Sequence, residues 1–241
     1  MKIISIHQPH YHPWLGLLDK IAKSHEHIVL DDVQFRKRNF QNRAQYSSPK
    51  GTKLLSLPVL AKGHQQQDGQ IQAIKLAPQD LRKQFLTLKH RYNQTPGWKV
   101  IEDELENLYL QSYENLAHIN LALLNFTMAL YGVVTPLILS SSLKSLGQKN
   151  QKLIEICQQR QATHYLSGNG ARKYMDDVLF ARHGIQVQYQ TFTHPEYEQH
   201  TGQDFQPGCF ALDWFCLQPD AAKDMFRAQN FEPFRAKYAQ A

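Results

Sequence analysis

The residues best suited to chemistry in this chain stand together near its N-terminus, in the run His7-Gln8-Pro9-His10-Tyr11-His12-Pro13. Its imidazoles, carboxamide and phenol can exchange protons or bind an anion. Residues 2–6 are mostly β-branched and residues 14–22 are apolar at helical spacing, so the run is predicted to join a strand to a helix. Because open α/β sheets bind ligands beyond the carboxyl ends of their strands, we expect His7, Gln8 and Tyr11 to contact a substrate. His7, nearest the strand, is the candidate for proton transfer.

The three histidines of this run do not match a recognisable metal site. Zinc sites combine convergent side chains at fixed spacing, and the pattern His7-x-x-His10-x-His12 fits none of the standard spacings. Pro9 and Pro13 also stiffen the loop and separate its side chains. We therefore predict that no metal is bound here.

A second polar cluster follows the next predicted strand, at residues 27–30. Asp31 and Asp32 could accept a hydroxyl or an amine of a substrate, with Asp32 as a second catalytic candidate and Gln34 assisting it. Lys37 and Arg43 could hold a phosphate or a carboxylate. Neighbouring side chains usually point apart, so a true carboxylate dyad is not expected. The alternative is a structural acidic turn, or a salt bridge between the acidic pair and these basic residues.

Strands and helices alternate along most of the chain, which predicts a mostly parallel sheet flanked by helices in three layers, similar to Rossmann folds. Small polar residues follow two later strands, in Ser140-Ser141-Ser142 and in Ser167-Gly168-Asn169-Gly170. Backbone N–H groups in such turns can approach a phosphate closely. Since parallel strands end at the same edge, we expect one cleft there, lined by His7, Asp32, Ser141, Ser167 and Gly168.

The hydrophobic periodicity predicts where these elements begin and end. Further strands are expected at residues 52–59, 135–139, 163–166 and 185–189, and helices at residues 80–92, 98–110, 115–131, 148–159 and 174–183. Residues 36–50 have little periodicity and are expected to form a polar loop, and residues 61–70 either a lid or an idle surface loop. The whole chain, 1–241, is predicted to be one domain with a helical insertion at about residues 79–131.

The C-terminal part, about residues 191–241, is predicted to cover the pocket at the strand ends. It supplies Tyr197 and Gln199 as candidate substrate contacts. Asp213 lies in an apolar stretch and is either a buried helix cap or a site carboxylate. Neither Cys209 nor Cys216 shows the signature of a nucleophile.

Composition limits the classes of partner. Lysine and arginine number 27 against 21 acidic residues, a net charge of +6. The one compact basic cluster, Arg36-Lys37-Arg38 with Arg43, is too small for a nucleic-acid duplex and suits a phosphate group, although an ordinary solvated surface is the alternative. We therefore expect an anionic small molecule and no nucleic acid. Lys173 replaces the third glycine of a dinucleotide fingerprint, so no cofactor is predicted.

Cysteine usage and hydropathy predict the compartment. The three cysteines form no C-x-x-C pair and are odd in number, which favours a reducing environment. No run approaches the roughly 20 apolar residues of a membrane span, and the N-terminal run is too short for a signal peptide. We expect a cytoplasmic protein without a membrane span.

Several motifs resemble the WbqC family of bacterial proteins, which are found among genes for surface polysaccharides. The pattern Gln-Pro-x-Tyr-x-Pro-x-x-Gly begins at Gln8 and is followed by Asp-Asp-Val-Gln-Phe at residues 31–35 and by Asn42-Arg43. Later matches keep the same order, at Ser141-Ser142-Leu143, residues 165–168, Tyr197-x-Gln199, Phe205-x-Pro207 and Leu212-Asp213. The resemblance covers about residues 3–218 and implies that the matched polar residues, Asn42 among them, contact substrate. His10 and His12 fall on unconstrained positions of the pattern.

The resemblance implies a role in O-antigen-like surface-polysaccharide biosynthesis, and the residues predict a pocket for an anionic, hydroxyl-rich molecule. We therefore predict a transferase that modifies an activated sugar, an amino sugar or a polysaccharide precursor. Its donor would be a nucleotide sugar or an acyl or aminoacyl compound.

The residues leave the reaction open. Acyl or aminoacyl transfer would use His7 and Asp32 near an amine, whereas glycosyl transfer would use Asp32 with a diphosphate held by Lys37 and Arg43. One alternative is a non-enzymatic sugar-nucleotide-binding or scaffold protein. Another is a nucleotidyltransferase-like enzyme, because His10-x-His12 faintly resembles the paired-histidine loop of that superfamily.

Overall fold

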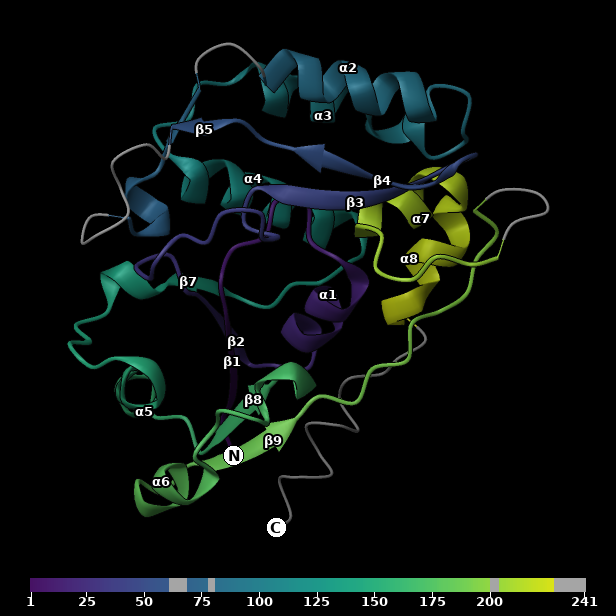
Figure 1. Ribbon diagram of the computed structural model, residues 1–241. Helices are drawn as coiled ribbons and strands as arrows, with labels where there is room; N and C mark the ends of the chain where they lie inside the picture. The colour runs from purple at the N-terminus through teal and green to yellow at the C-terminus, as the bar shows by residue number, and fades with distance from the viewer. Residues whose placement is uncertain (61–68, 78–80, 200–203, 228–241) are drawn as a thin grey trace.

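A parallel sheet forms the centre of the computed structural model, which describes residues 1–60, 69–77, 81–199 and 204–227 (Figure 1). Its five strands run in the order β7-β2-β1-β8-β9, and every neighbouring pair is parallel. They are β1 (Ile3–His7), β2 (Glu26–Val29), β7 (Leu137–Leu139), β8 (His164–Ser167) and β9 (Gln186–Tyr189). The expected three-layer α/β fold is confirmed.

The alternation of side chains along β1 divides the sheet's two faces. Ile4 and Ile6 pack with Ile28 of β2 against α5 (Lys149–Gln159) and α6 (Asp177–Arg182). Burying one such isoleucine is worth about 1.5–3 kcal/mol, so this face drives assembly of the layer. Ser5 and His7 point to the opposite face. That face is covered by α1 (Leu15–Ala22), whose eight residues are all buried.

A long excursion leaves the sheet between β2 and β7 and forms the upper part of the molecule in Figure 1. It contains the antiparallel hairpin β3 (Arg43–Ser48) and β4 (Gly51–Ser56), a short pair β5 (Val59–Leu60) and β6 (Lys75–Leu76), and the 3-10 turn η1 (Ile71–Ala73). The helices α2 (Leu81–Tyr92), α3 (Trp98–Leu110) and α4 (Leu116–Leu130) follow. Residues 61–68 and 78–80, which include most of the expected lid or loop and the expected helix start, lie outside the described residues.

The hairpin corrects one sequence expectation. Residues 36–50 were expected to form a polar loop, but β3 occupies 43–48 and pairs with β4 in full register. Polar residues such as Gln45 alternate there with the buried side chains of Ala44 and Tyr46, so hydrophobicity is too low to mark a strand although the period is two. Gly51, at φ +90°, closes the tight turn. The excursion therefore begins well before residue 79.

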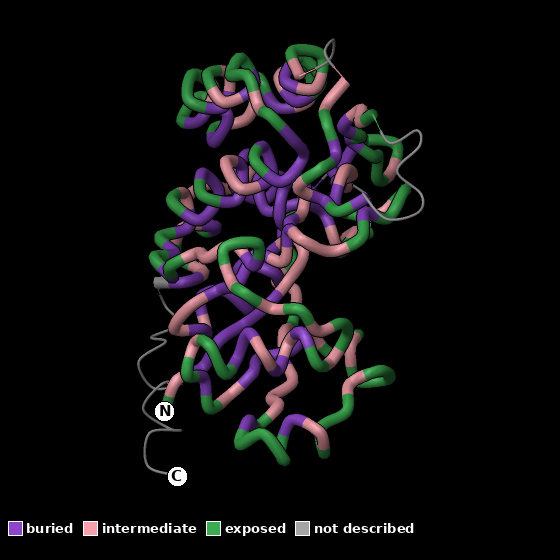
Figure 2. The backbone as a smooth tube through the Cα atoms, turned by 90° about the vertical axis from the view of Figure 1, so that its left-hand side faces the viewer, coloured by how far each residue is buried: buried purple, intermediate pink, exposed green. Residues whose placement is uncertain are grey.

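The helices agree closely with the sequence periodicity. The bounds of α3 are those predicted, and Asn115 caps α4 by accepting a hydrogen bond of 3.0 Å from the His118 N–H. No helix among the described residues is long and apolar enough to span a membrane. Figure 2 shows the buried segments running through the middle of the molecule, with exposed segments around them.

The C-terminal part closes the same core. After β9, an extended run leads to α7 (Ala211–Leu217) and α8 (Pro219–Arg227), and α7 packs against α3. The Gly97 N–H donates to the Cys216 carbonyl at 3.0 Å, and a Cβ at Gly97 would lie 2.0 Å from the Phe215 carbonyl oxygen. Only glycine fits this contact. Residues 200–203 and 228–241 of the predicted covering segment lie outside the described part of the chain.

Candidate functional site

The parallel strands all end at one edge of the sheet, and four of them lead directly into the polar residues singled out in the sequence. From β1 the chain moves outward to β2 and β7, then returns to β8 on the other side of β1 and continues to β9. The strand order therefore reverses between β1 and β8, the place where open α/β sheets bind their ligands. His7 and Gln8 follow β1 at this point, and Ser167 with Gly168 ends β8.

The His7 side chain presents a free lone pair at the switch point. Its Nδ1 lies 2.9 Å from the Gln8 carbonyl oxygen, which can only accept, so Nδ1 carries the proton and Nε2 is the basic nitrogen of the neutral ring. Burial, followed by the nearby Lys20 and His10, lowers the pKa of His7 well below its usual range. The imidazole is therefore neutral at physiological pH and able to accept a proton.

His10 extends this arrangement toward the surface. Its ring stands edge-on to His7 with centroids 4.6 Å apart, and lies 5.6 Å from the ring of Phe40. Burial lowers the pKa of His10 to about 3, so it too is neutral. Phe40 is 50% exposed and stands next to the exposed cluster Arg36-Lys37-Arg38. An aromatic surface and a basic cluster thus flank the mouth of the switch point.

Hydrogen bonds fix the loop that carries Phe40. Gln41 donates from Nε2 to the Gln8 side chain at 2.7 Å and accepts from the Arg36 N–H at 2.7 Å. Asn120 of α4 donates to the Gln41 carbonyl, also at 2.7 Å. Gln8 is therefore part of the framework that holds this loop against the strand end.

Lys20 is a residue that the sequence interpretation missed. It lies on α1, is 3% exposed, and donates from Nζ to the Ile6 carbonyl of β1 at 3.2 Å. Burial lowers the pKa of Lys20 to about 7. The signal in the sequence was a lysine within a helix whose other residues are almost all apolar, which is unusual for an exposed charge.

Asp31 and Asp32 converge on one serine, contrary to the expectation that they point apart. The Ser140 hydroxyl lies within hydrogen-bond distance of one oxygen of each carboxylate. Ser141 donates to Asp31 from its N–H at 2.9 Å and from its hydroxyl at 2.7 Å. Lys152 of α5 forms an ion pair of 2.7 Å with Asp32. The acidic pair thus joins the ends of β2 and β7, and its ionic partner is Lys152 rather than the nearby basic loop.

The end of β8 is open. Ser167 is 1% exposed, and its hydroxyl makes no hydrogen bond of good geometry among the described residues, although its interaction with Tyr165 opposes part of the rise that burial causes in the Tyr165 pKa. Gly168 has an ordinary φ of −73°, and a Cβ built on Gly168 or Gly170 would meet nothing within 4 Å. Neither packing nor backbone conformation requires glycine at Gly168, so it leaves space for a molecule to approach the backbone.

Other predicted contacts lie away from the strand ends or in the hairpin. Tyr11 is fully buried and shares a 2.7 Å hydrogen bond with the Tyr109 hydroxyl. Asn42 donates to the Leu57 carbonyl at 3.0 Å, while Arg43, which opens β3, has a buried Nε without a partner among the described residues. Gln34 is exposed and bridges to Gln70.

Tyr197 and Gln199 belong to a different buried cluster. Asp213 of α7 accepts hydrogen bonds from the Ser47 N–H at 2.9 Å, the Ser47 hydroxyl at 2.8 Å, the Tyr197 hydroxyl at 2.8 Å and the Tyr92 hydroxyl. Gln199 donates to the Gln206 carbonyl at 3.0 Å. Four donors satisfy one buried carboxylate, so this cluster ties α7 to β3 and α2.

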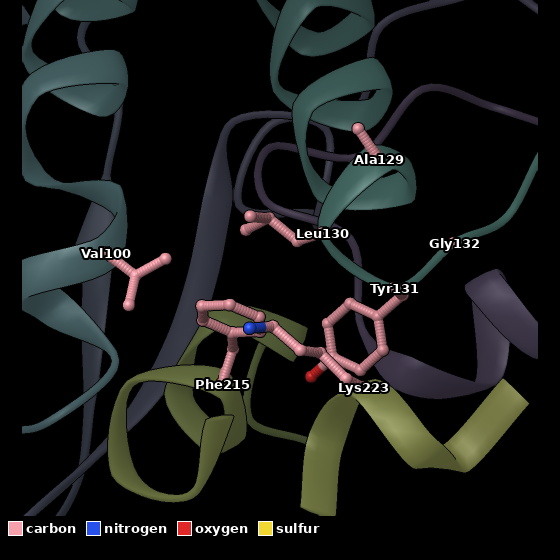
Figure 3. A pocket seen from close by; sticks show the side chains of 7 residues that line it. All are labelled: Val100, Ala129, Leu130, Tyr131, Gly132, Phe215 and Lys223. Carbon is pink, nitrogen blue, oxygen red and sulfur yellow. The ribbon is translucent and has the colours of Figure 1, made fainter. Parts of the chain in front are cut away.

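No group of three histidine, cysteine, aspartate or glutamate side chains within the described ranges is arranged to hold a metal ion. The three cysteines are buried, and burial raises the pKa of both Cys157 and Cys209 to about 12. A cavity of about 290 Å³ lies between α3, α4, α7 and α8, far along the chain from the strand ends (Figure 3). Its walls are mainly apolar, with Lys223 as the one charged residue lining it, and they do not suit a hydroxyl-rich ligand.

Comparison with known proteins covers nearly the whole chain. The profile of the WbqC-like protein family matches residues 8–225. The uncharacterized protein Rv1507c of Mycobacterium tuberculosis is 32% identical over 216 residues, which make up 88% of this chain and 92% of that protein. No solved structure matches the chain. The matched range includes the switch point, the acidic pair and the Asp213 cluster.

Proposed function

The chain belongs to the WbqC-like protein family, and from that premise we propose that it is a transferase acting on an activated sugar, an amino sugar or a polysaccharide precursor in bacterial surface-polysaccharide biosynthesis. One observation carries the proposal. A neutral His7 with a free Nε2 stands at the topological switch point, opposite the open turn at Gly168. A general base beside room for a phosphate-bearing donor is what group transfer to an amine or a hydroxyl requires.

The state of the carboxylates favours acyl or aminoacyl transfer. Glycosyl transfer calls for a carboxylate that is free to act on the acceptor, but both oxygens of Asp31 and of Asp32 already accept hydrogen bonds or an ion pair. His7 Nε2 has no such partner. In this proposal His7 is therefore the base, and Asp32 holds the ends of β2 and β7 in place. Glycosyl transfer is the second candidate.

The proposed step moves one proton at His7. Nε2 accepts the proton of the acceptor amine or hydroxyl as that nitrogen or oxygen bonds to the donor's acyl carbon. The bond from the acyl carbon to the leaving group then breaks, and the leaving group takes the proton from His7. General base catalysis by a positioned side chain contributes about 10²–10⁴-fold to the rate.

The donor would lie across the switch point. The Gly168 turn would hold its phosphate through backbone N–H groups, and the Phe40 ring beside His10 would stack on its base or sugar ring. Lys37 and Arg43 would add charge from the loop and the hairpin. This places the expected partner in the class of nucleotide sugars and acyl or aminoacyl donors.

Thermal-shift measurements with two donor panels, followed by turnover assays, test this proposal. We expect a member of the acyl or aminoacyl panel to raise the melting temperature and to be consumed. His7→Asn keeps a donor for the Gln8 carbonyl but removes Nε2, so it should spare donor binding and lower turnover about 10²–10⁴-fold.

Asp32→Asn is the matched control for the identity of the base. If Asp32 only positions the strand ends, turnover should fall less than about tenfold, because no proton transfer is lost. A larger loss in Asp32→Asn than in His7→Asn would move the catalytic role to Asp32. Binding without turnover would indicate a sugar-nucleotide-binding or scaffold protein, and no binding from either panel would refute the transferase proposal.

A further inference from the structure

Lys20 is a buried amine without an anionic partner. Its side chain is 3% exposed, and its one hydrogen bond in the described structure is to the Ile6 carbonyl at 3.2 Å. No carboxylate of the described residues lies against it. An isolated ammonium group is strongly disfavoured in a protein interior, so a folded chain normally pairs such a residue or replaces it with an apolar one.

The groups around Lys20 add positive potential and do not offset it. His7 from β1, His10 from the following loop and His27 from β2 are the titratable side chains that face it, and Lys20 lowers the pKa of each of them. On its own helix, Asp19 forms an ion pair of 2.8 Å with Lys23 and accepts from Gln190 at 2.7 Å. The helix's one carboxylate is thus engaged elsewhere.

Lys20 lies directly below the switch point. The carbonyl that it contacts belongs to Ile6, and the next residue is His7, whose ring is half-buried beside the half-buried His10. A negatively charged group that entered beside these two rings would meet the uncompensated amine below them. The open turn at Gly168 is on the neighbouring strand end.

We propose that Lys20 is the counter-ion of a phosphate group bound at the carboxyl end of β1, and that it takes up a proton when the phosphate binds. This inference rests on the proposed function and names the part of the substrate that the switch point recognises. It also divides the work between two residues. Lys20 carries the positive charge, and that charge keeps His7 neutral, so the His7 lone pair stays available as a base.

Lys20 acts here through electrostatics and through His7, so it is a positioning residue. In the free protein its amine is only partly protonated near neutral pH, because burial lowers its pKa to about 7. A phosphate nearby favours the charged form. Binding should therefore draw up to one proton from the solvent, and the amount should depend on pH in a way that a purely structural lysine would not produce.

Calorimetric titration with pyrophosphate as the probe measures this coupling. The heat is recorded at pH 7.5–8 in several buffers of different ionisation enthalpy, which gives the number of protons taken up per ligand. For the wild-type chain we expect between zero and one proton, rising toward one at the higher pH. Acetate, a single negative charge without phosphate oxygens, should bind at least about tenfold more weakly.

Two variants separate charge from proton uptake. Lys20→Met keeps the length of the side chain without its charge, so pyrophosphate affinity should fall at least about tenfold and proton uptake should vanish. Lys20→Arg is always charged and should bind pyrophosphate with no proton uptake. Circular dichroism and a urea titration check that both variants are folded.

Three results would overturn the inference. They are wild-type binding without proton uptake, unchanged affinity and uptake in Lys20→Met, and no binding of pyrophosphate to the wild-type chain at millimolar concentration. Each is independent of turnover. Failure of the transferase proposal would show instead as absent donor consumption with pyrophosphate binding intact.

Discussion

Replacing His12 by asparagine should make the stability of the protein less dependent on pH below neutrality. His12 is 3% exposed, stacks on Phe210 with centroids 5.0 Å apart, and shares a 2.6 Å hydrogen bond with the Tyr109 hydroxyl. Its Nδ1 is buried without a partner among the described residues. Burial lowers the pKa of His12 from 6.5 to about 3.

The sign of the effect follows from where the proton binds. Between pH 6.5 and about 3 the unfolded chain holds a proton on this imidazole and the folded chain does not, so the free energy of unfolding falls as the pH falls through 6.5. At pH 5 the loss is about 2 kcal/mol for one such histidine. His27, which is 1% exposed and also has a pKa lowered by burial, adds a similar loss. Together they remove a large part of a typical stability of about 5–15 kcal/mol.

Asparagine suits the position because His12 has a φ of 52°, in the left-handed region that asparagine tolerates. Urea unfolding followed by tryptophan fluorescence at pH 7.5 and pH 5 gives the free energy of unfolding at each pH. The loss between these two values should be about 2 kcal/mol smaller in His12→Asn than in the wild-type chain, even if the variant is less stable at both.

Tyr109→Phe is the matched control, since it removes the hydroxyl that His12 contacts but leaves the imidazole in place. It should lower stability at both pH values by about 1–2 kcal/mol and leave the pH dependence nearly unchanged. An identical pH dependence in His12→Asn and the wild-type chain would refute the reasoning, because it would mean that the buried ring is protonated as easily as in the unfolded chain.

Two further predictions concern positions where packing decides the outcome. Asp213→Asn should cost about 2–4 kcal/mol in urea unfolding, because an amide nitrogen cannot accept from the hydroxyls that converge on this carboxylate. Gly97→Ala should cost at least about 2 kcal/mol, since its Cβ would lie 2.0 Å from a backbone oxygen, whereas Gly168→Ala should change stability by less than about 0.5 kcal/mol and weaken pyrophosphate binding in calorimetry. Equal stability losses for the two glycine variants would contradict this account.

The sheet and its functional edge could be predicted because their signals are local. A short β-branched run such as residues 2–6, followed by a proline-rich turn, is enough to identify a strand and its carboxyl end. Parallel pairing then follows from the alternation with helices. The strand ends of His7, Asp32 and Ser167 were located correctly on that basis.

The remaining features depend on partners distant in sequence. Asp213 meets Ser47, 166 residues away, and Asp32 meets Lys152, 120 residues away, and no periodicity encodes such pairs. The β3–β4 hairpin was missed because its polar outer face hides its period of two. The buried state of Lys20 becomes visible only once the helix that carries it is covered on every side.

The distribution of charge along the edge points to the sign of the substrate. On the side of β2 and β7, the two carboxylates are balanced by serine donors and by Lys152, so that region has no charge left to offer a ligand. On the side of β1 and β8, Lys20 is buried without a carboxylate, and the histidines above it are held neutral. A cation would be repelled there, and a neutral sugar would leave the amine unpaired. An anionic group at the switch point is the ligand that stabilises both Lys20 and the neutral His7, which is why we place the phosphate of the donor between β1 and β8 and not beside the acidic pair.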